Sequence, residues 1–384
     1  RGGPMVIKNN IIENNQEGGI VCKGLDVEII ENIIRNNSTH FVGGGIYFID
    51  CGNTSKISMN ILTHNEANLG GGIRCAYCSP LISENVFFEN TASQGGGGIV
   101  LRSSDALIVN NVFNGNCAGS GGAILCEETS APKIVNNTLY GNNATYLGGA
   151  LYFNYYSNAV IMNSILWGNS ARSGKEIFIG NAGVSAVSID YSNVERGEKS
   201  VFVKPGGSVL AWGDNMIDED PGFVDRANND FHLLYTSSCV GAGLESYTYS
   251  PGKDMEGDPR GSGHGSVEIG ADEFYGRLYF TGEATPGGEI KARIVGGPGS
   301  QAYALLIGTE VLDPPLPTKY GALYLKTPYT TVGPLGAFPA DGVLTLKARI
   351  PQSPVAPYDL PMQVLMDSTY LFHSLTNLAV LKIR

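Results

Sequence analysis

The hydrophobic and polar positions of the first 200 residues follow one repeating pattern. Each copy reads I-x-x-N-x-φ-φ-x-N, where φ is an apolar residue, then a short polar stretch, then G-G-φ-x-φ. The second asparagines of successive copies are 22 to 28 residues apart, at Asn15, Asn37, Asn65, Asn90, Asn116, Asn142 and Asn169. A period in this range with little helical pattern is typical of a solenoid.

Three short strands are predicted in each copy. After the Gly-Gly pair the chain alternates between two faces, as in Ile46-Tyr47-Phe48, and a period of two predicts a strand. A second short strand precedes the first asparagine, and a third covers the φ-φ pair. Three short strands joined by tight turns describe one rung of a parallel β-helix. A leucine-rich solenoid is excluded because regular leucine spacing and helical stretches are both missing.

The repeated glycines and asparagines are predicted to be architectural rather than catalytic. Rungs stack about 4.8 Å apart, so a residue in a turn meets its own copy directly above and below. Glycine fits where the turn needs a positive φ or where stacked backbones leave no room for a Cβ. Asparagine fits because its amide can hydrogen-bond to the amide of the next rung and form a ladder.

The stacking of rungs also predicts where most of the seven cysteines lie. One inward row is predicted to be Cys22, Phe48, Cys75, Leu101, Cys126 and Phe153, with the thiols filling gaps in the core. Cys51 and Cys78 take equivalent positions on adjacent rungs, so their Cα atoms should lie within the range of a disulfide. A zinc site is not expected, because no second CxxC accompanies Cys75-x-x-Cys78 and the five histidines are scattered.

The segment after the repeats carries several specific phrases. They are DEDPGFVD, DFHL, SSCVGAG, DMEGDPR and VEIGADEF, between residues 218 and 274. These phrases resemble the closing segment of secreted bacterial right-handed parallel β-helix repeat proteins of the choice-of-anchor type. The resemblance covers roughly residues 1–275. It implies a right-handed parallel β-helix over 1–200, a closing or capping segment over 201–276, and a secreted or cell-surface location. Most such proteins have no known activity.

Composition changes from about residue 277 onward. Twelve of the 19 prolines and only one asparagine, Asn377, lie in this last part of the chain. Alternating runs such as EIKARIVG and VLTLKARI are separated by Pro/Gly turns. This pattern predicts an antiparallel β-sandwich over 277–384, which we interpret as an attachment, spacer or binding module. The fold class expected for the whole chain is therefore all-β, a β-helix solenoid followed by a small β-sandwich.

Charge and hydropathy limit the partners that can be expected. The net charge is −11, made up of −13 before residue 277 and +2 from there onward, so clustered positive charge for nucleic acid is missing. The chain contains no run of 18 apolar residues, so no membrane span is predicted. The chain begins inside a repeat, so we expect an upstream cap to have been removed or another chain to cover that end. Self-assembly of this chain head to tail, as a filament, is one hypothesis.

Outward positions of the repeat supply the candidate chemistry. One surface is predicted to hold Arg74, Arg102, Glu127, Tyr152, Asn154, Tyr155 and Tyr156. Arginine could act as the base for β-elimination of a uronate, and tyrosine rings could stack on sugars. The alternative is a solvated face with a weak Arg102–Glu127 pair. The short rungs argue against an enzyme because they leave little chain for the loops that would wall a cleft.

A calcium site is the second candidate. Asp254, Glu256 and Asp258 alternate in a glycine-containing segment, and carboxylates so placed can bind Ca²⁺. The full calcium-loop pattern is missing, so a turn in the closing segment is the favoured interpretation, and no other cofactor is expected. For the whole protein we expect an extracellular structural or adhesive role, with polysaccharide as a possible partner. A polysaccharide lyase and a pure glycan-binding module are the alternatives.

Overall fold

The computed structural model describes residues 4–234, 236–245, 254, 260 and 267–272, together with the backbone of the strands between residues 277 and 383. The chain divides into two compact units, and each is described by itself. The first consists of residues 1–232 and 238–273, and the second of 233–237 and 274–384. The described parts contain strands and two short 3-10 helices, and none of their helices is long and apolar enough to cross a membrane.

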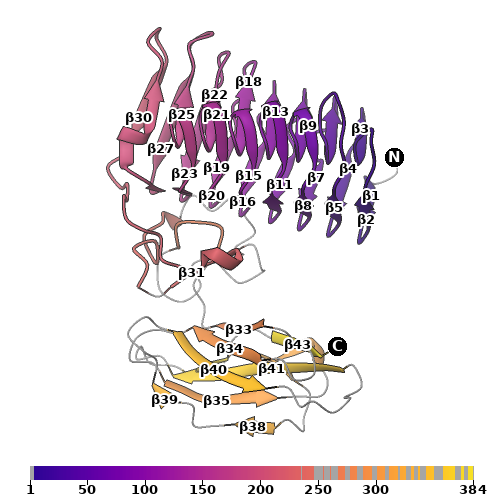
Figure 1. Ribbon diagram of the computed structural model, residues 1–384, viewed down its shortest axis with the longest axis vertical. Helices are drawn as coiled ribbons and strands as arrows, with labels where there is room; N and C mark the ends of the chain where they lie inside the picture. Colours follow the sequence, from indigo (N-terminus) through magenta and orange to yellow (C-terminus); the bar gives the residue numbers. More distant parts are fainter. Residues whose placement is uncertain are drawn as a thin grey trace. The chain divides into compact units, whose positions relative to one another are not determined.

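The first unit is a parallel β-solenoid, as the repeat predicts (Figure 1). Its strands form long stacks with one strand per rung, which we call sheets A, B, C and D. Sheet A has nine strands: β1 (Met5–Lys8), β4 (Val27–Ile30), β7 (Lys56–Ser58), β11 (Leu81–Ser83), β15 (Leu107–Val109), β19 (Lys133–Val135), β23 (Ala159–Met162), β27 (Ala186–Asp190) and β30 (Val209–Trp212).

Sheets B and C have eight strands each. Sheet B consists of β2 (Ile11–Glu13), β5 (Ile33–Arg35), β8 (Ile61–Thr63), β12 (Val86–Phe88), β16 (Val112–Asn114), β20 (Thr138–Tyr140), β24 (Ile165–Trp167) and β28 (Asn193–Val194). Sheet C consists of β3 (Ile20–Lys23), β6 (Ile46–Ile49), β10 (Ile73–Ala76), β14 (Ile99–Arg102), β18 (Ile124–Glu127), β22 (Leu151–Phe153), β26 (Ile177–Ile179) and β29 (Val201–Val203). These are the three strands per rung that the sequence predicts.

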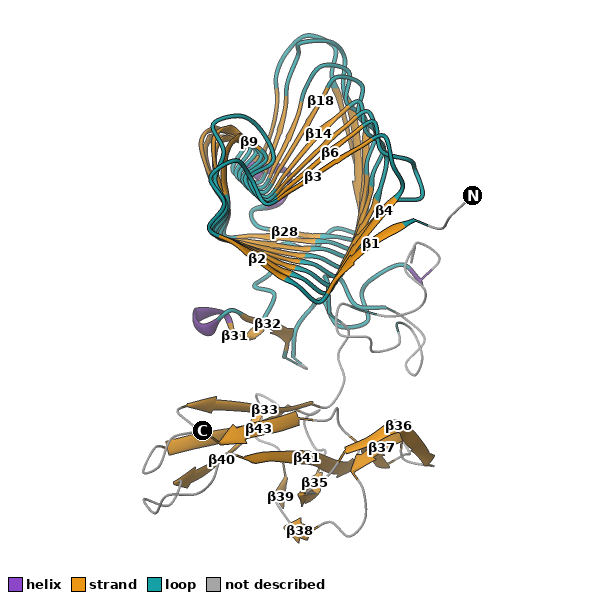
Figure 2. Ribbon diagram, turned by 90° about the vertical axis from the view of Figure 1, so that its right-hand side faces the viewer, coloured by secondary structure: helices purple, strands orange, loops and turns teal. Residues whose placement is uncertain are grey.

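Sheet D adds a fourth strand to five of the rungs, which the sequence did not predict. It consists of β9 (Glu66–Leu69), β13 (Thr91–Gly95), β17 (Cys117–Ser120), β21 (Asn143–Leu147) and β25 (Ser170–Ser173). These segments are polar or small and show no clean alternation, which is why a pattern of apolar positions does not detect them. Viewed along the stack, sheet D closes the corner between sheets B and C (Figure 2).

The core lies inside the solenoid, and the predicted inward row is buried. Phe48, Cys75, Leu101, Cys126 and Phe153 are fully buried, and Cys22 is 7% exposed. Rungs stay in register, since Ile73 pairs with Ile46 on one side and with Ile99 on the other. The aromatic rings of Phe87 and Phe113 stack with their centroids 4.5 Å apart. Identical positions therefore lie directly over one another, as the repeat requires.

The glycine pairs serve both predicted purposes. Gly70 has a φ of +70°, a conformation that side chains disfavour. At Gly71 a Cβ atom would lie 2.5 Å from the carbonyl oxygen of Thr91, so the backbones of neighbouring rungs meet too closely for any side chain. The sharp turn from sheet D into sheet C therefore depends on glycine.

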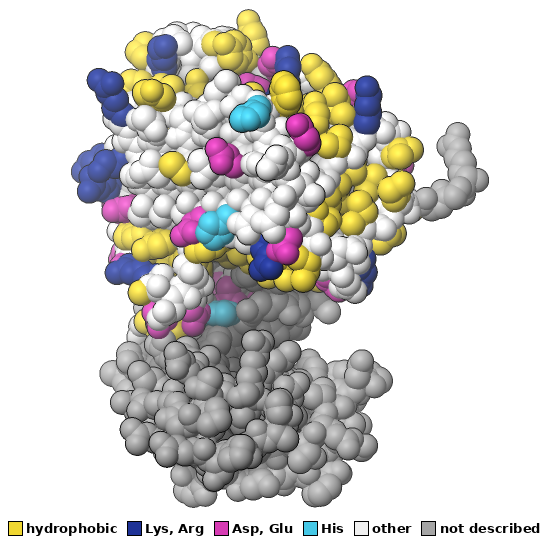
Figure 3. All heavy atoms as spheres, turned by 45° about the vertical axis from the view of Figure 1, so that its right-hand side comes forward, with side chains coloured by type: hydrophobic (Ala, Val, Ile, Leu, Met, Phe, Trp, Pro, Cys, Tyr) yellow, Lys and Arg dark blue, Asp and Glu magenta, His cyan; other side chains and the backbone are white. Residues whose placement is uncertain are grey.

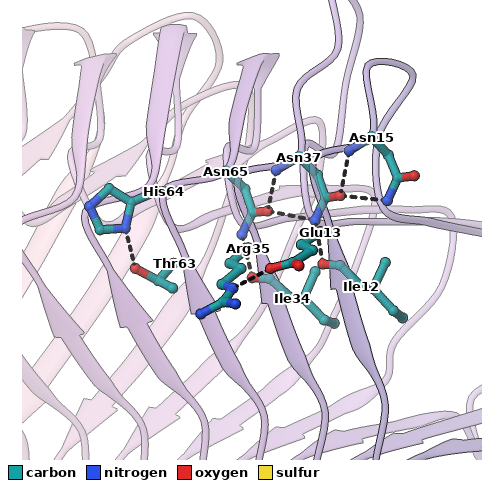
Figure 4. Close-up of polar contacts among 9 residues, drawn as sticks. All are labelled: Ile12, Glu13, Asn15, Ile34, Arg35, Asn37, Thr63, His64 and Asn65. Carbon is teal, nitrogen blue, oxygen red and sulfur yellow. Dashed lines mark hydrogen bonds and ion pairs between the residues drawn. The ribbon is translucent and has the colours of Figure 1, made fainter.

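The predicted asparagine ladder is present (Figure 4). The side-chain amide of Asn37 donates to Oδ1 of Asn65 at 3.0 Å and to the carbonyl oxygen of Ile12 at 2.9 Å. At the far end, Asn169 donates from Nδ2 to Oε2 of Glu176 at 2.6 Å. Glu176 is buried, and its burial raises the pKa of the carboxyl group to about 8. A carboxyl group thus takes the place that the next asparagine would have held.

The short helix η1 (Gly197–Ser200) directly precedes β29 of sheet C. The closing segment then adds β31 (Phe223–Asp225), η2 (Arg226–Asn228) and β32 (Asp230–Leu233). β31 and β32 pair as a two-stranded sheet. Phe231 of β32 packs on Tyr140 of sheet B with ring centroids 5.1 Å apart. Part of the outer face of sheet B is therefore covered by residues far away in sequence.

The second unit is built from antiparallel strands, as its alternating runs predict. Its pairings include β33 with β34, β34 with β40, and β35 with β41. The strands are β33 (Arg277–Gly282), β34 (Glu289–Val295), β35 (Gln301–Ile307), β36 (Val311–Thr318), β37 (Gly321–Leu325), β38 (Thr330–Val332), β39 (Gly336–Ala337), β40 (Val343–Arg349), β41 (Tyr358–Asp367), β42 (His373–Leu375) and β43 (Ala379–Ile383).

Candidate functional site

The outer face of sheet C is partly covered, which changes the surface expected from the sequence. Arg74, Val100 and Leu125 occupy one outward row, yet they are only 4%, 0% and 6% exposed. The cause is sheet D, which folds back over this row. A Cβ atom at Gly95 of sheet D would lie 2.5 Å from Cδ2 of Leu125. In the middle of the stack this outward row therefore belongs to a second buried layer.

Arg74 and Glu127 form an ion pair within this covered face. Nη2 of Arg74 lies 3.4 Å from Oε1 of Glu127, although the two residues belong to rungs two apart. Burial raises the pKa of the Glu127 carboxyl group, and the neighbouring Arg74 opposes that rise. Nη1 of Arg74 is buried without a hydrogen-bond partner. Arg74 is thus enclosed and committed to Glu127, out of reach of a bulky substrate.

Arg102 has a different partner from the one considered in the sequence analysis. Its Nε lies 2.6 Å from Oε2 of Glu128, although Glu127 is the register partner of Arg102 on the adjacent strand. The guanidinium carbon also lies 5.7 Å from the centre of the Tyr77 ring, within the range of a cation–π contact. The hydrogen bond to Glu128 raises the pKa of Arg102 further above its usual value. Arg102, Tyr77 and Glu128 therefore form one connected cluster at the end of sheet C.

This cluster continues along a row of turn residues. Tyr77, Glu128 and Tyr155 occupy the same turn position on three rungs and have φ values of 57°, 52° and 50°. A non-glycine residue with a positive φ has a strained backbone, and such residues recur at functional sites. At these three positions the turn itself requires the conformation. Tyr155 and the adjacent Tyr156 are 49% and 58% exposed. The turn thus presents aromatic rings to solvent next to the Arg102–Glu128 pair.

Tyr152 and Asn154 are engaged within the protein. The Tyr152 ring lies edge-on to Phe178 with centroids 5.4 Å apart, and burial raises the pKa of its hydroxyl group to about 12. Oδ1 of Asn154 accepts a hydrogen bond from the backbone amide of Ala182 at 3.2 Å. The candidate saccharide residues therefore separate into an enclosed set, with Arg74, Glu127 and Tyr152, and an exposed set, with Arg102, Tyr155 and Tyr156.

The cysteines are all present as thiols, Cys51 and Cys78 included. The Cys51 thiol lies 3.2 Å from the carbonyl oxygen of Cys22 and donates to it. A hydrogen bond from the Cys75 thiol lowers the pKa of Cys78. The same hydrogen bond, together with burial, raises the pKa of Cys75. The Cys51–Cys78 disulfide is not formed in this structure, and it stays a prediction about the oxidised protein.

The calcium candidates are only partly described. Asp254 is buried, while Glu256 and Asp258 lie outside the described residues. Among the residues that the structure does describe, no group of three or more His, Cys, Asp or Glu side chains is placed to hold a metal ion. The calcium site therefore stays a prediction.

A hollow of about 340 Å³, which the sequence did not predict, lies on the outer face of sheet B. It is lined by Ile61, Thr63, Val86, Phe88, Val112, Asn114, Asn229, Phe231, His232 and Asp272. One signal was available: the outward position of the φ-φ strand is apolar on successive rungs, at Ile61, Val86 and Val112. The contribution of the closing segment had no such signal, because it comes from more than 100 residues away.

Comparisons with protein-family models, with curated proteins and with solved structures found no match. The likeness of the closing phrases to secreted β-helix proteins therefore stays an expectation. The parallel β-solenoid itself rests on the strand pairing described above.

Proposed function

We propose that this protein is an extracellular structural β-solenoid that binds a glycan chain along the turn edge of sheet C. The observation that carries the proposal is the cluster in which Glu128 holds the Arg102 guanidinium over the ring of Tyr77. Tyr155 and Tyr156 extend the same edge with exposed rings. The extracellular location is supported only by the resemblance of the closing segment.

The physical case for glycan binding is the combination of rigid aromatic rings with planar polar groups. Aromatic faces stack on the C–H faces of sugars, and arginine and glutamate offer paired donors and acceptors for hydroxyl groups. Tyr77 and Tyr155 lie three rungs apart, which at the spacing of stacked strands is about 14 Å. Because both stand on a continuous β-stack, little entropy is lost in ordering them for an extended ligand.

Binding is favoured over lyase chemistry by the state of the two arginines. A general base must first lose its proton, and a guanidinium group does so with great difficulty. The Glu128 hydrogen bond raises the pKa of Arg102 further, and Arg74 is enclosed with Glu127. Neither arginine is therefore suited to abstract the proton of a uronate.

The test is a glycan array probed with the purified chain, followed by calorimetry on the best ligand. The double variant Tyr155→Ala/Tyr156→Ala should weaken binding by about tenfold or more, because tyrosine is enriched among the few residues whose truncation costs more than ~1 kcal/mol of binding energy. Tyr146→Ala is the matched control, since Tyr146 is 57% exposed but belongs to sheet D. Thermal unfolding of each variant checks that the fold is retained.

Two results would contradict the proposal. The first is an array without any bound glycan, or a double variant that binds as well as the Tyr146→Ala control. The second is release of unsaturated uronate products from an acidic polysaccharide that disappears in Arg102→Ala. That outcome would restore the lyase alternative.

A further inference from the structure

Four of the seven cysteines lie close together inside the first three rungs. Cys22, Cys51, Cys75 and Cys78 are 7%, 4%, 0% and 2% exposed. The Cys51 thiol donates to the carbonyl oxygen of Cys22, and the Cys75 thiol is hydrogen-bonded to that of Cys78. Hydrophobic side chains reach the surface on this N-terminal side of the solenoid (Figure 3), and the ring of Tyr77 is 50% exposed. Buried thiols therefore flank a turn residue whose ring is open to solvent.

Packing does not require cysteine at the turn position of Cys51 and Cys78. Serine occupies this position on the next three rungs, at Ser104, Ser130 and Ser157, and all three are fully buried. The backbone amide of Ser104 donates to Oγ of Ser130 at 3.2 Å, and the Cys78 sulfur likewise has a hydrogen bond with the backbone of Cys51. A hydroxyl group thus fills this position well. Cysteine on two adjacent rungs supplies what serine lacks, which is a reversible covalent bond.

The two cysteines are in register with each other. Ile49 pairs with Ala76, so Cys51 and Cys78, each two residues further on, are one strand spacing apart. A spacing of about 4.8 Å lies within the Cα separations that a disulfide accepts. The oxidant is a low-molecular-weight disulfide such as oxidised glutathione. The Cys78 thiolate attacks it and releases one thiol, and Cys51 then displaces the second, so the protein loses two hydrogen atoms and the small disulfide becomes two thiols.

The same turn carries Tyr77, whose ring supports Arg102 at the glycan edge. The backbone amide of Tyr77 donates to the carbonyl oxygen of Arg102 at 3.0 Å, which ties the turn to the following rung. A disulfide between Cys78 and Cys51 would tie the adjoining residue to the preceding rung. With both sides held, Tyr77 would lose less conformational freedom when a ligand binds.

We infer that Cys51 and Cys78 form a redox latch, which fixes Tyr77 for glycan binding when it is closed and loosens it when it is open. This inference rests on the proposed function, because it describes the regulation of the same edge. The competing pair is Cys75–Cys78. Cys75 belongs to the inward row, so a bond to it would close the turn on itself and tie it to no other rung.

The test compares two forms of the purified chain, one equilibrated with oxidised glutathione and one with dithiothreitol. Because both thiols are buried, exchange needs transient opening of the turn, so long equilibration replaces brief treatment. Mass spectrometry under non-reducing conditions should find Cys51 linked to Cys78 in the oxidised form. Hydrogen exchange at residues 76–79 should then be slower by about tenfold or more. The glycan identified on the array should bind the oxidised form about threefold to tenfold more tightly.

Variants separate the latch from other effects of oxidation. Cys78→Ser keeps a hydroxyl group at the turn, as at Ser104, and should make the two forms identical in exchange and in affinity. Cys51→Ser should do the same and decides the matter if the first variant does not fold. Cys117→Ser is the matched control, because Cys117 is a half-buried thiol on sheet D, and it should keep the difference between the forms. A Cys75–Cys78 link, equal hydrogen exchange in the two forms, or a redox dependence that persists in Cys78→Ser would overturn the inference.

Failure of the proposed function gives a different result. If neither form binds any glycan, that function is refuted, whereas slower hydrogen exchange in the oxidised form still supports the latch on the turn. If both forms bind a glycan equally well, the function stands and its control by the latch is refuted.

Discussion

Replacing one buried asparagine tests how much the ladder contributes to the solenoid. Asn90 lies in the middle of the stack and is fully buried. Its Oδ1 accepts from the backbone amide and the side-chain amide of Asn65, at 3.1 and 3.0 Å. Its Nδ2 donates to the carbonyl oxygen of Leu62 at 2.9 Å and to Oδ1 of Asn116 at 3.0 Å. Asn90→Ala removes all four hydrogen bonds.

The expected loss of stability follows from the groups left without these bonds. The backbone amide of Asn65 loses the acceptor provided by Asn90, and the Leu62 carbonyl oxygen loses a donor. A buried polar group that loses its partner costs about 1 to 3 kcal/mol, so two such groups predict a loss of about 2 to 6 kcal/mol. Asn90→Ser should cost less, because the chain itself places Ser164 in the parallel ladder, where its Oγ accepts from the Asn137 amide at 3.2 Å.

The assay is urea denaturation followed by circular dichroism, with the free energy of unfolding obtained from the midpoint and slope. Asn143→Ala serves as the control, because Asn143 is exposed and its side-chain amide donates to the exposed Ser170 hydroxyl group at 2.7 Å. This control should change stability by less than about 0.5 kcal/mol. If Asn90→Ala costs no more than the control, the ladder does not stabilise the fold and the reasoning is refuted.

Three further predictions concern the core. Burial raises the pKa of the Glu176 carboxyl group from 4.5 to about 8, so this group should destabilise the fold progressively as pH rises through that interval. Glu176→Gln should remove this part of the pH dependence of the unfolding free energy in urea titrations. Phe153→Ala should cost about 3 to 5 kcal/mol, and a loss below about 1 kcal/mol would contradict its inward position. Oxidised glutathione should link Cys51 to Cys78, which mass spectrometry under non-reducing conditions would detect; full alkylation of both thiols would disprove the disulfide.

The sequence by itself determined the repeating part of this protein. In a stack of rungs, positions one period apart in sequence lie one strand spacing apart in space, so the period translates directly into contacts. The asparagine ladder, the inward row with Phe48 and Phe153, and the glycine turns follow from this rule. The alternating runs of the last part of the chain likewise predicted antiparallel strands.

Only the tertiary structure decided which surfaces are exposed to solvent and which residues at non-equivalent positions of the repeat contact each other. Arg74 is only 4% exposed, although the local pattern of its strand places the arginine outside. Gly95 of sheet D lies against Leu125 of the same outward row. Glu127 pairs with Arg74 two rungs away, because a long side chain reaches past its nearest neighbours. Asp272 reaches the hollow on sheet B through the closing segment. These contacts join segments with no common period, so no pattern in the sequence could specify them.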